Sequence, residues 1–146
     1  MRRELAEGFE VDDDRDRVDI DAVYGFLTNA YWALGRSRDT VERLVREAAK
    51  VVAVYAPGGE LIGFCRVVSD AENMAWLGDV FVLPEHRGRG LGAELVREAV
   101  EDPRFRDLQW YLGTRDAHGL YAKFGFTPAN ERTMVRGPRP RSEPSD

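Results

Sequence analysis

Three glycines alternate at positions 88, 90 and 92, between a short apolar run and an amphipathic segment. The run Val80–Leu83 is typical of a buried strand, and apolar residues recur at helical spacing between 91 and 101. Glycine lets the backbone approach a ligand closely, and the N–H groups at a helix start favour negative charge. The segment 87–92 therefore predicts a loop that holds a phosphate or diphosphate.

Three interpretations of this loop compete on the residues alone. The glycines are also explained by tight packing of a strand against a helix. A Walker loop is excluded because no Gly-Lys-Ser or Gly-Lys-Thr occurs. A dinucleotide fingerprint requires G-x-G-x-x-G in the first βα unit and an acid at the end of the next strand. Asp116 follows the next expected strand, but the spacing here is G-x-G-x-G and the βα unit begins late in the chain. The dinucleotide interpretation is therefore poor.

Composition excludes several classes of protein. The 146 residues suit one domain of ordinary globular composition. A net charge of −5 argues against a nucleic-acid partner, which requires clustered Lys and Arg. Cys65 is the only cysteine, and His86 and His118 have no partner at metal-ligand spacing, so we expect neither a disulfide nor a metal site.

The apolar runs are too short to cross a membrane, which requires about 20 residues. The longest are Val51–Ala56 and Val80–Leu83, and the N-terminal Met1–Leu5 has no apolar stretch of a signal peptide. We therefore expect a cytoplasmic protein without a membrane partner.

The pattern of apolar residues predicts an α/β fold with a mixed sheet, partly antiparallel and partly a right-handed parallel crossover. Asp19 is expected to cap the first helix and Asp116 a later short helix, and Ser37 is expected to begin the second helix. The expected strands are 9–11, 51–55, 61–68, 76–83, 108–112 and one containing Met134-Val135, and the expected helices start at 20, 37, 90 and 116. We expect one domain over 1–136 and a disordered tail over 137–146.

Two motifs in order resemble those of the GNAT superfamily of N-acetyltransferases. Residues 82–92 match its acyl-CoA-binding motif at Arg87, Gly90 and Gly92, and residues 120–126 match a second motif in which Tyr121 precedes Gly-Phe on a short helix. The resemblance extends from Val51 to Phe126. It implies a single GNAT-like domain with a mostly antiparallel sheet, a splayed parallel crossover and two helices on each side.

The resemblance also implies a co-substrate, acetyl-CoA. Backbone N–H groups of 87–92 would hold the diphosphate, the strand before the loop would pair with the pantetheine arm, and an N–H near Val82 would polarise the thioester carbonyl. Thr114 stands where the family often has an Asn, which puts a side-chain contact with that arm in question. The implied cofactor-binding residues are Phe81, Val82, Leu83, Arg87, Gly88, Arg89, Gly90, Leu91, Gly92 and Thr114.

Two residues match catalytic roles of that family. Tyr121 corresponds to its general acid, which would protonate the leaving thiolate. The apolar face that Tyr121 shares with Leu120 and Phe124 is equally typical of a core residue. Asp79, on the strand before the loop, is the candidate base, with a salt-bridge partner as the alternative. His118 is a weaker candidate for proton relay.

The acceptor would be a primary amine of a small molecule or a peptide. Tyr31, Trp32 and Arg36 lie where the family's variable first helices border the acceptor site, although Trp32 and Trp76 also suit a core and Arg36 a surface. A non-catalytic acyl-CoA sensor and a dinucleotide-binding oxidoreductase fragment remain alternatives. The oligomeric state is open, with a homodimer as one arrangement.

Overall fold

A computed structural model describes residues 1–137, and their strands form one six-stranded sheet in the order β1-β2-β3-β4-β5-β6. Neighbouring strands are antiparallel except β5 and β6, which run parallel. The predicted mixed, mostly antiparallel sheet is thus confirmed. The strands are β1 (Arg2–Glu4), β2 (Glu10–Asp12), β3 (Lys50–Tyr55), β4 (Leu61–Ser69), β5 (Met74–Val82) and β6 (Gln109–Tyr111).

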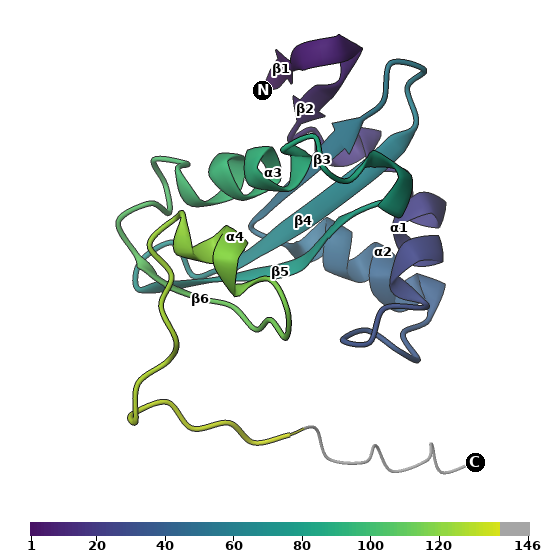
Figure 1. Ribbon diagram of the computed structural model, residues 1–146. Helices are drawn as coiled ribbons and strands as arrows, with labels where there is room; N and C mark the ends of the chain where they lie inside the picture. The colour runs from purple at the N-terminus through teal and green to yellow at the C-terminus, as the bar shows by residue number, and fades with distance from the viewer. Residues whose placement is uncertain (138–146) are drawn as a thin grey trace, which may run out of the picture.

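Helices cover both faces of the sheet, with α1 and α2 on one side and α3 and α4 on the other (Figure 1). This agrees with the expectation of two helices on each side. The helices are α1 (Ile20–Leu27), α2 (Arg38–Glu47), α3 (Leu91–Val100) and α4 (His118–Ala122), and three 3-10 turns occupy Ala6–Gly8, Arg15–Arg17 and Pro84–His86.

Strand β3 lies at the centre of both cores, because each of its six residues is buried. Val52 and Val54 pack toward α3, whereas Val51 and Ala53 pack toward α1 and α2. A strand that is covered on both faces exposes neither side to water. Its sequence is therefore a run of mostly β-branched apolar residues and does not alternate between apolar and polar residues.

One of the two predicted helix caps forms. Asp19 accepts a hydrogen bond from the N–H of Ala22 at 3.1 Å, and Ser37 caps α2 in the same way. The prediction that Asp116 caps the last helix is wrong, because α4 begins two residues later. The hydroxyl of Thr114 instead accepts the N–H of Ala117 at 3.1 Å.

The ends of the sheet differ from the prediction. The strand expected at 9–11 is shifted by one residue, and it pairs with β1, which was not expected. Strand β1 is charged and exposed, so it carries no hydrophobic alternation. The strand expected at Met134-Val135 does not form, and both side chains are about nine-tenths exposed. Of the tail expected to be disordered, residues 138–146 lie outside the described residues.

Strands β5 and β6 separate soon after they pair. Their register covers only Met74 to Trp76 of β5, opposite Gln109 to Tyr111 of β6. The remainder of β5, from Leu77 to Val82, pairs with β4 on one side, and no strand of residues 1–137 pairs with its other edge. An open strand edge of this kind presents backbone N–H and C=O groups to an extended ligand.

Candidate functional site

The glycine loop joins β5 to α3 through left-handed backbone. Gly88 and Gly90 have φ of 84° and 77°, which a residue with a Cβ adopts only with strain. A Cβ built on either would meet nothing within 4 Å, so the space above the loop is open. None of the described side chains caps the N-terminus of α3. Its first N–H groups are therefore available to an anion.

A groove of about 1170 Å³ runs from this loop along the open edge of β5 to α4. It brings together most of the residues that the sequence predicts for cofactor binding. The predicted residues that line it are Phe81, Val82, Leu83, Arg87, Gly88, Gly90, Leu91 and Gly92.

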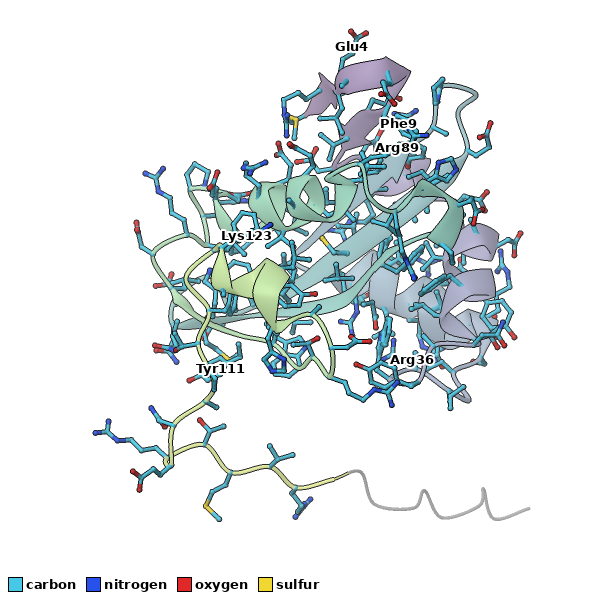
Figure 2. All side chains as sticks on the ribbon, viewed as in Figure 1. Glu4, Phe9, Arg36, Arg89, Tyr111 and Lys123 are labelled. Carbon is cyan, nitrogen blue, oxygen red and sulfur yellow. The ribbon has the colours of Figure 1, made fainter. Side chains whose placement is uncertain are left out.

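Two of the predicted cofactor-binding residues lie outside this groove. The guanidinium of Arg89 turns toward the N-terminal segment, where it pairs with Glu7 and lies 5.4 Å from the centre of the Phe9 ring; Figure 2 labels Arg89 and Phe9 side by side near β2. Thr114 uses its hydroxyl at the start of α4, as described above. Arg87 stays at the groove but donates from Nε to the carbonyl of Val82 at 3.0 Å.

A β-bulge in β5 determines where Asp79 points. Phe64 pairs with Phe81 and Arg66 pairs with Gly78, so β5 has one residue more than β4 across this interval. Asp79 has a positive φ of 54°, which is uncommon for a residue other than glycine. Ala75 and Leu77 belong to the core beneath α3, and strict alternation would send Asp79 there as well. The bulge turns it to the opposite face.

On that face, three side chains donate to the carboxylate of Asp79. Trp32 Nε1 lies 2.9 Å from Oδ1, Arg36 Nη1 lies 2.9 and 2.8 Å from the two oxygens, and Arg66 Nε lies 2.6 Å from Oδ2. The Asp79 side chain is only 2% exposed. Burial acts to raise its pKa, but the charges and hydrogen bonds of Arg66 and Arg36 outweigh burial and lower it. The geometry therefore agrees with the alternative interpretation of Asp79, in which it is a salt-bridge partner.

Tyr121 lies on α4 at the junction of two cavities. It lines the groove and also a second cavity of about 590 Å³, which contains Asp79. The side chain is buried among the α3 core residues, and its ring meets that of Phe126 edge-on. Burial raises the pKa of Tyr121 to about 12. The phenol is therefore protonated across the neutral range. The position of Tyr121 is compatible with a core residue and also with a general acid.

This second cavity, which we call the acceptor cavity, contains all three predicted acceptor-site residues, Tyr31, Trp32 and Arg36. They come from the connection between α1 and α2, and Figure 2 labels Arg36 there. Tyr31 is held by Arg115, whose N–H donates to its hydroxyl at 3.2 Å and whose guanidinium lies 3.8 Å from its ring centre. Tyr31, Trp32, Arg36 and Arg115 thus form one wall of the acceptor cavity.

Arg66 is a residue of this site that the sequence prediction missed. It lies on β4 between Cys65 and Val67, both of which are fully buried. A single arginine in an otherwise apolar strand requires an acid to neutralise it, because an isolated buried charge is strongly disfavoured. The sequence could therefore have predicted a buried ion pair between Arg66 and Asp79, the acid on the adjacent apolar strand.

Other candidates stand apart from this arrangement. The Cys65 thiol is fully buried, which raises its pKa to about 12, so it is a poor nucleophile. His118 lines neither the groove nor the acceptor cavity. Among residues 1–137, no cluster of three or more His, Cys, Asp or Glu side chains is placed to hold a metal ion. No helix in that range has the length and hydropathy to span a bilayer.

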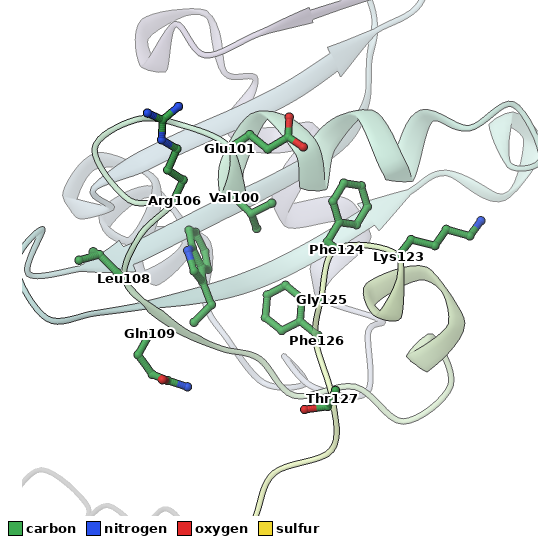
Figure 3. A pocket seen from close by; sticks show the side chains of 11 residues that line it. Val100, Glu101, Arg106, Leu108, Gln109, Lys123, Phe124, Gly125, Phe126 and Thr127 are labelled. Carbon is green, nitrogen blue, oxygen red and sulfur yellow. The ribbon is translucent and has the colours of Figure 1, made fainter.

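A further hollow of about 610 Å³ lies between the end of α3, β6 and the chain after α4 (Figure 3). Its lining includes Arg106, Phe124 and Phe126, and it contains none of the predicted site residues. We therefore place the candidate site in the groove and the acceptor cavity, which meet at Tyr121.

The chain is similar to known proteins over most of its length. Residues 47–128 match the model of the acetyltransferase (GNAT) domain. A Bacillus subtilis (strain 168) protein, provisionally named a ribosomal protein bS18-alanine N-acetyltransferase, is 30% identical over 78% of both chains. A structure from Xanthomonas campestris, provisionally assigned to the same family, is 36% identical over 88% of this chain and 92% of that one, with a TM-score of 0.82. One from Deinococcus radiodurans is 25% identical over 93% of both, with a TM-score of 0.72. This chain belongs to the GNAT acetyltransferase family.

Proposed function

We propose that the protein transfers an acetyl group from acetyl-CoA directly to a primary amine, with Tyr121 as the general acid. The observation that carries the proposal is the position of Tyr121, at the point where the groove meets the acceptor cavity. A group that protonates the leaving sulfur must reach both the co-substrate and the acceptor. Among the catalytic residues expected from the sequence, Tyr121 alone lines both spaces.

The glycine loop fits the diphosphate of coenzyme A. Gly88 and Gly90 leave the loop surface free of side chains, and the uncapped N-terminus of α3 points its N–H groups into the same space. These are the requirements of a backbone anion site. Arg87 lines the groove beside them and adds positive charge.

The open edge of β5 fits an extended arm. Phe81, Val82 and Leu83 line the groove on the side that no strand covers. Backbone groups there would pair with the amides of the pantetheine arm as an added strand does. A backbone N–H at this edge, near Val82, would then donate to the carbonyl oxygen of the acetyl group as negative charge develops on it.

The transfer forms an amide C–N bond and breaks the thioester C–S bond, so one proton leaves the nitrogen and one reaches the sulfur. Tyr121 supplies the second proton in this proposal. No recorded hydrogen bond of residues 1–137 uses its hydroxyl, and its raised pKa keeps the proton on the phenol at neutral pH. The phenol is a weaker acid than the coenzyme thiol, whose pKa is about 8.5, so it acts by donating a hydrogen bond that stabilises the negative charge as it develops on the leaving sulfur.

Asp79 is a poor candidate for removing the proton from the amine. A base requires a free oxygen and a pKa near the working pH, whereas both Asp79 oxygens accept hydrogen bonds from arginines and its pKa is lowered. We propose instead that Asp79 is a positioning residue, which holds Trp32, Arg36 and Arg66 in place at the acceptor cavity.

The test is a free-thiol assay with acetyl-CoA and a panel of polyamines, amino acids, aminoglycosides and peptides. The panel includes peptides with an N-terminal alanine, the acceptor named for the Bacillus relative. With the best acceptor, Tyr121→Phe should lower kcat by about a hundredfold and leave the Kd for acetyl-CoA unchanged. Tyr24→Phe on α1 is the matched control, because Tyr24 lines neither cavity.

Two results would contradict the proposal in different ways. Wild-type turnover in Tyr121→Phe would remove the acid role while leaving acetyl transfer intact. Tight acetyl-CoA binding without thiol release on any amine would instead favour a non-catalytic acyl-CoA-binding domain of the same fold.

A further inference from the structure

Arg36 and Arg66 share one carboxylate, and each uses only part of its guanidinium to bind it. Arg36 reaches Asp79 through Nη1 alone, and Arg66 reaches it through Nε alone. A guanidinium carries five N–H donors in a planar fork. Within residues 1–137, no other hydrogen-bond acceptor is recorded for either side chain, so most of their donors are left for a ligand.

The two arginines border the acceptor cavity and are more exposed than the carboxylate that they bind. The Asp79 side chain is 2% exposed, whereas those of Arg36 and Arg66 are 25% and 13% exposed. Both arginines line the cavity together with Tyr121. The carboxylate therefore lies beneath the two guanidinium groups and orients them, while their outer edges reach the space where an acceptor would sit.

The charge of the cavity favours an anion with a single charge. Its lining holds three arginines, with Arg115 as the third, against the carboxylates Asp79 and Asp116. One positive charge is thus in excess, in a chain whose net charge is −5. A carboxylate carries one negative charge and matches the planar fork of a guanidinium, whereas a phosphate monoester carries between about 1.5 and 2.

Aromatic rings border the same space. The Trp32 and Trp76 side chains line the cavity and are 38% and 40% exposed, which is unusual for such large apolar groups. Rings in this position provide an apolar surface for the hydrocarbon part of an acceptor whose charged end lies on the arginines.

We propose that the acceptor is an amino acid or a related amine that carries a free carboxylate, and that Arg36 and Arg66 bind this carboxylate. The inference rests on the proposed acetyl transfer and specifies its acceptor. Asp79 holds the two guanidinium groups apart and in plane, and Tyr121 lies across the same cavity at the reacting end. An N-terminal peptide lacks a carboxylate beside its amine, so it is a poor acceptor for this site.

The kinetic test compares each amino acid of a panel with its own carboxamide, in wild type and in Arg36→Met and Arg66→Met. In wild type, kcat/KM should be about 10- to 100-fold higher for the acid, the usual effect of losing a hydrogen bond to a charged group. Each variant should lose that preference, because its KM for the acid rises by a larger factor than its KM for the carboxamide. Arg38→Met is the control, since Arg38 pairs with Asp21 away from the cavity.

A binding test separates this inference from the transfer reaction. Calorimetry measures N-acetyl amino acids, their carboxamides and phosphoethanolamine against wild type and Arg36→Met. Arginine-dependent binding of the N-acetyl acids alone supports the inference, even where no amine releases thiol and the proposed transfer fails. Equal kcat/KM for acids, carboxamides and N-terminal peptides, or tighter binding of the phosphate, would overturn the inference while leaving acetyl transfer in place.

Discussion

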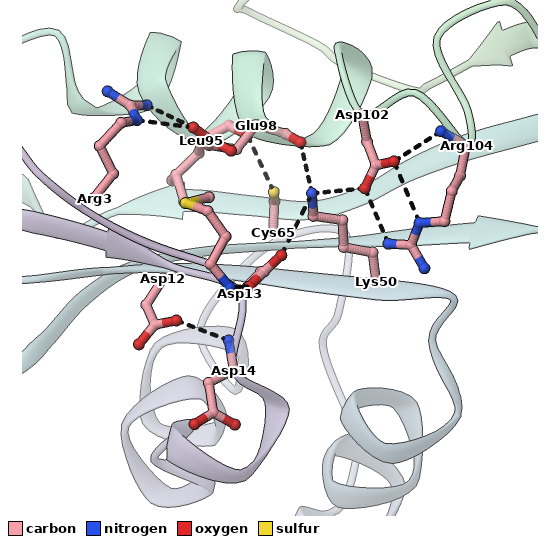
Figure 4. Close-up of polar contacts among 11 residues, drawn as sticks. Arg3, Asp12, Asp13, Asp14, Lys50, Cys65, Leu95, Glu98, Asp102 and Arg104 are labelled. Carbon is pink, nitrogen blue, oxygen red and sulfur yellow. Dashed lines mark hydrogen bonds and ion pairs between the residues drawn. The ribbon is translucent and has the colours of Figure 1, made fainter.

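Two buried ionic clusters lie on opposite faces of the sheet, one around Asp79 and one around Lys50. The Lys50 side chain is 7% exposed, and its Nζ lies 2.9 Å from the carbonyl of Glu98, 2.9 Å from Asp102 and 3.7 Å from Asp13 (Figure 4). The ammonium group donates two hydrogen bonds, to the Glu98 carbonyl and to Asp102, and Asp13 adds an ionic contact. Asp102 is further bound by Arg104 at 2.9 Å. The Lys50 cluster is therefore closed.

The Asp79 cluster has the opposite character. Its carboxylate is saturated, but its two arginines retain donors and border a cavity. Neither Lys50 nor Asp102 lines the groove or the acceptor cavity. Neighbouring residues of β4 lie on the two opposite faces of the sheet, since Cys65 packs in the core beneath α3 and Arg66 binds Asp79. We propose that the Lys50 cluster serves the fold and that the Asp79 cluster serves a ligand.

Asp79→Asn should give the largest effect on both stability and activity. The substitution leaves two guanidinium groups without a buried counter-charge, which costs about 3 kcal/mol in the free energy of unfolding. It should also raise KM for the acceptor, because Arg36 and Arg66 lose the group that orients them. Urea unfolding and the free-thiol assay measure the two effects. Full stability with normal KM would show that the cluster has no positioning role.

Lys50→Met should reduce stability without changing catalysis. A methionine fills most of the volume but leaves Asp102 with Arg104 as its remaining partner, so we expect a loss of about 2 kcal/mol. KM and kcat should stay at their wild-type values, since the cluster touches neither cavity. Arg43→Met, on the exposed side of α2, is the control for loss of a surface cation. A changed KM in Lys50→Met would contradict the inference that only the Asp79 cluster contributes to acceptor binding.

Lowering the pH should gradually reduce the stability that both clusters contribute, by less than the two substitutions above. Burial acts to raise the pKa of Asp102, but hydrogen bonds from Arg104 and Lys50 hold it well below its usual range, and the pKa of Asp79 is also lowered. A lowered folded-state pKa contributes stability that is complete above the unfolded value of about 3.9. That stability is lost as the pH falls through the folded-state pKa.

The measurement is the free energy of unfolding between about pH 5 and pH 2. Near pH 3, below the unfolded-state value of about 3.9, its slope in Asp102→Asn should be shallower than in wild type by up to about 1.4 kcal/mol per pH unit, the full effect of one carboxylate. Identical slopes in wild type and variant would mean that Asp102 is not protected by its partners in the native state.

Local chemistry was sufficient to predict much of this molecule. The spacing of Val23, Leu27, Val41 and Val45 identified the buried faces of α1 and α2, because a helix places residues three and four apart on one side. Alternating glycines identified the loop at the start of α3, since only glycine adopts its left-handed backbone without strain. The second motif identified α4, which carries Tyr121.

Long-range pairing decided the rest. Strand β1 has no apolar pattern and exists because β2 offers it an edge. Asp116 does not cap α4, and the hydroxyl of Thr114 accepts the N–H of Ala117 just before that helix, a contact that depends on how the chain leaves β6. The face on which Asp79 lies depends on a single extra residue in β5 relative to β4, and a bulge is a property of two strands together.

The residue types along this chain were enough to place a strand, a glycine loop and a helix in order, because backbone preferences and hydrophobic periodicity act over a few neighbours. Only the folded sheet brought Arg66 of β4 and Arg36 of the α1–α2 connection within 3 Å of Asp79 on β5. Charges that are distant in sequence meet through register and burial. The loop of alternating glycines thus marks where an acyl-CoA would lie, and tertiary packing shapes the cavity that faces it.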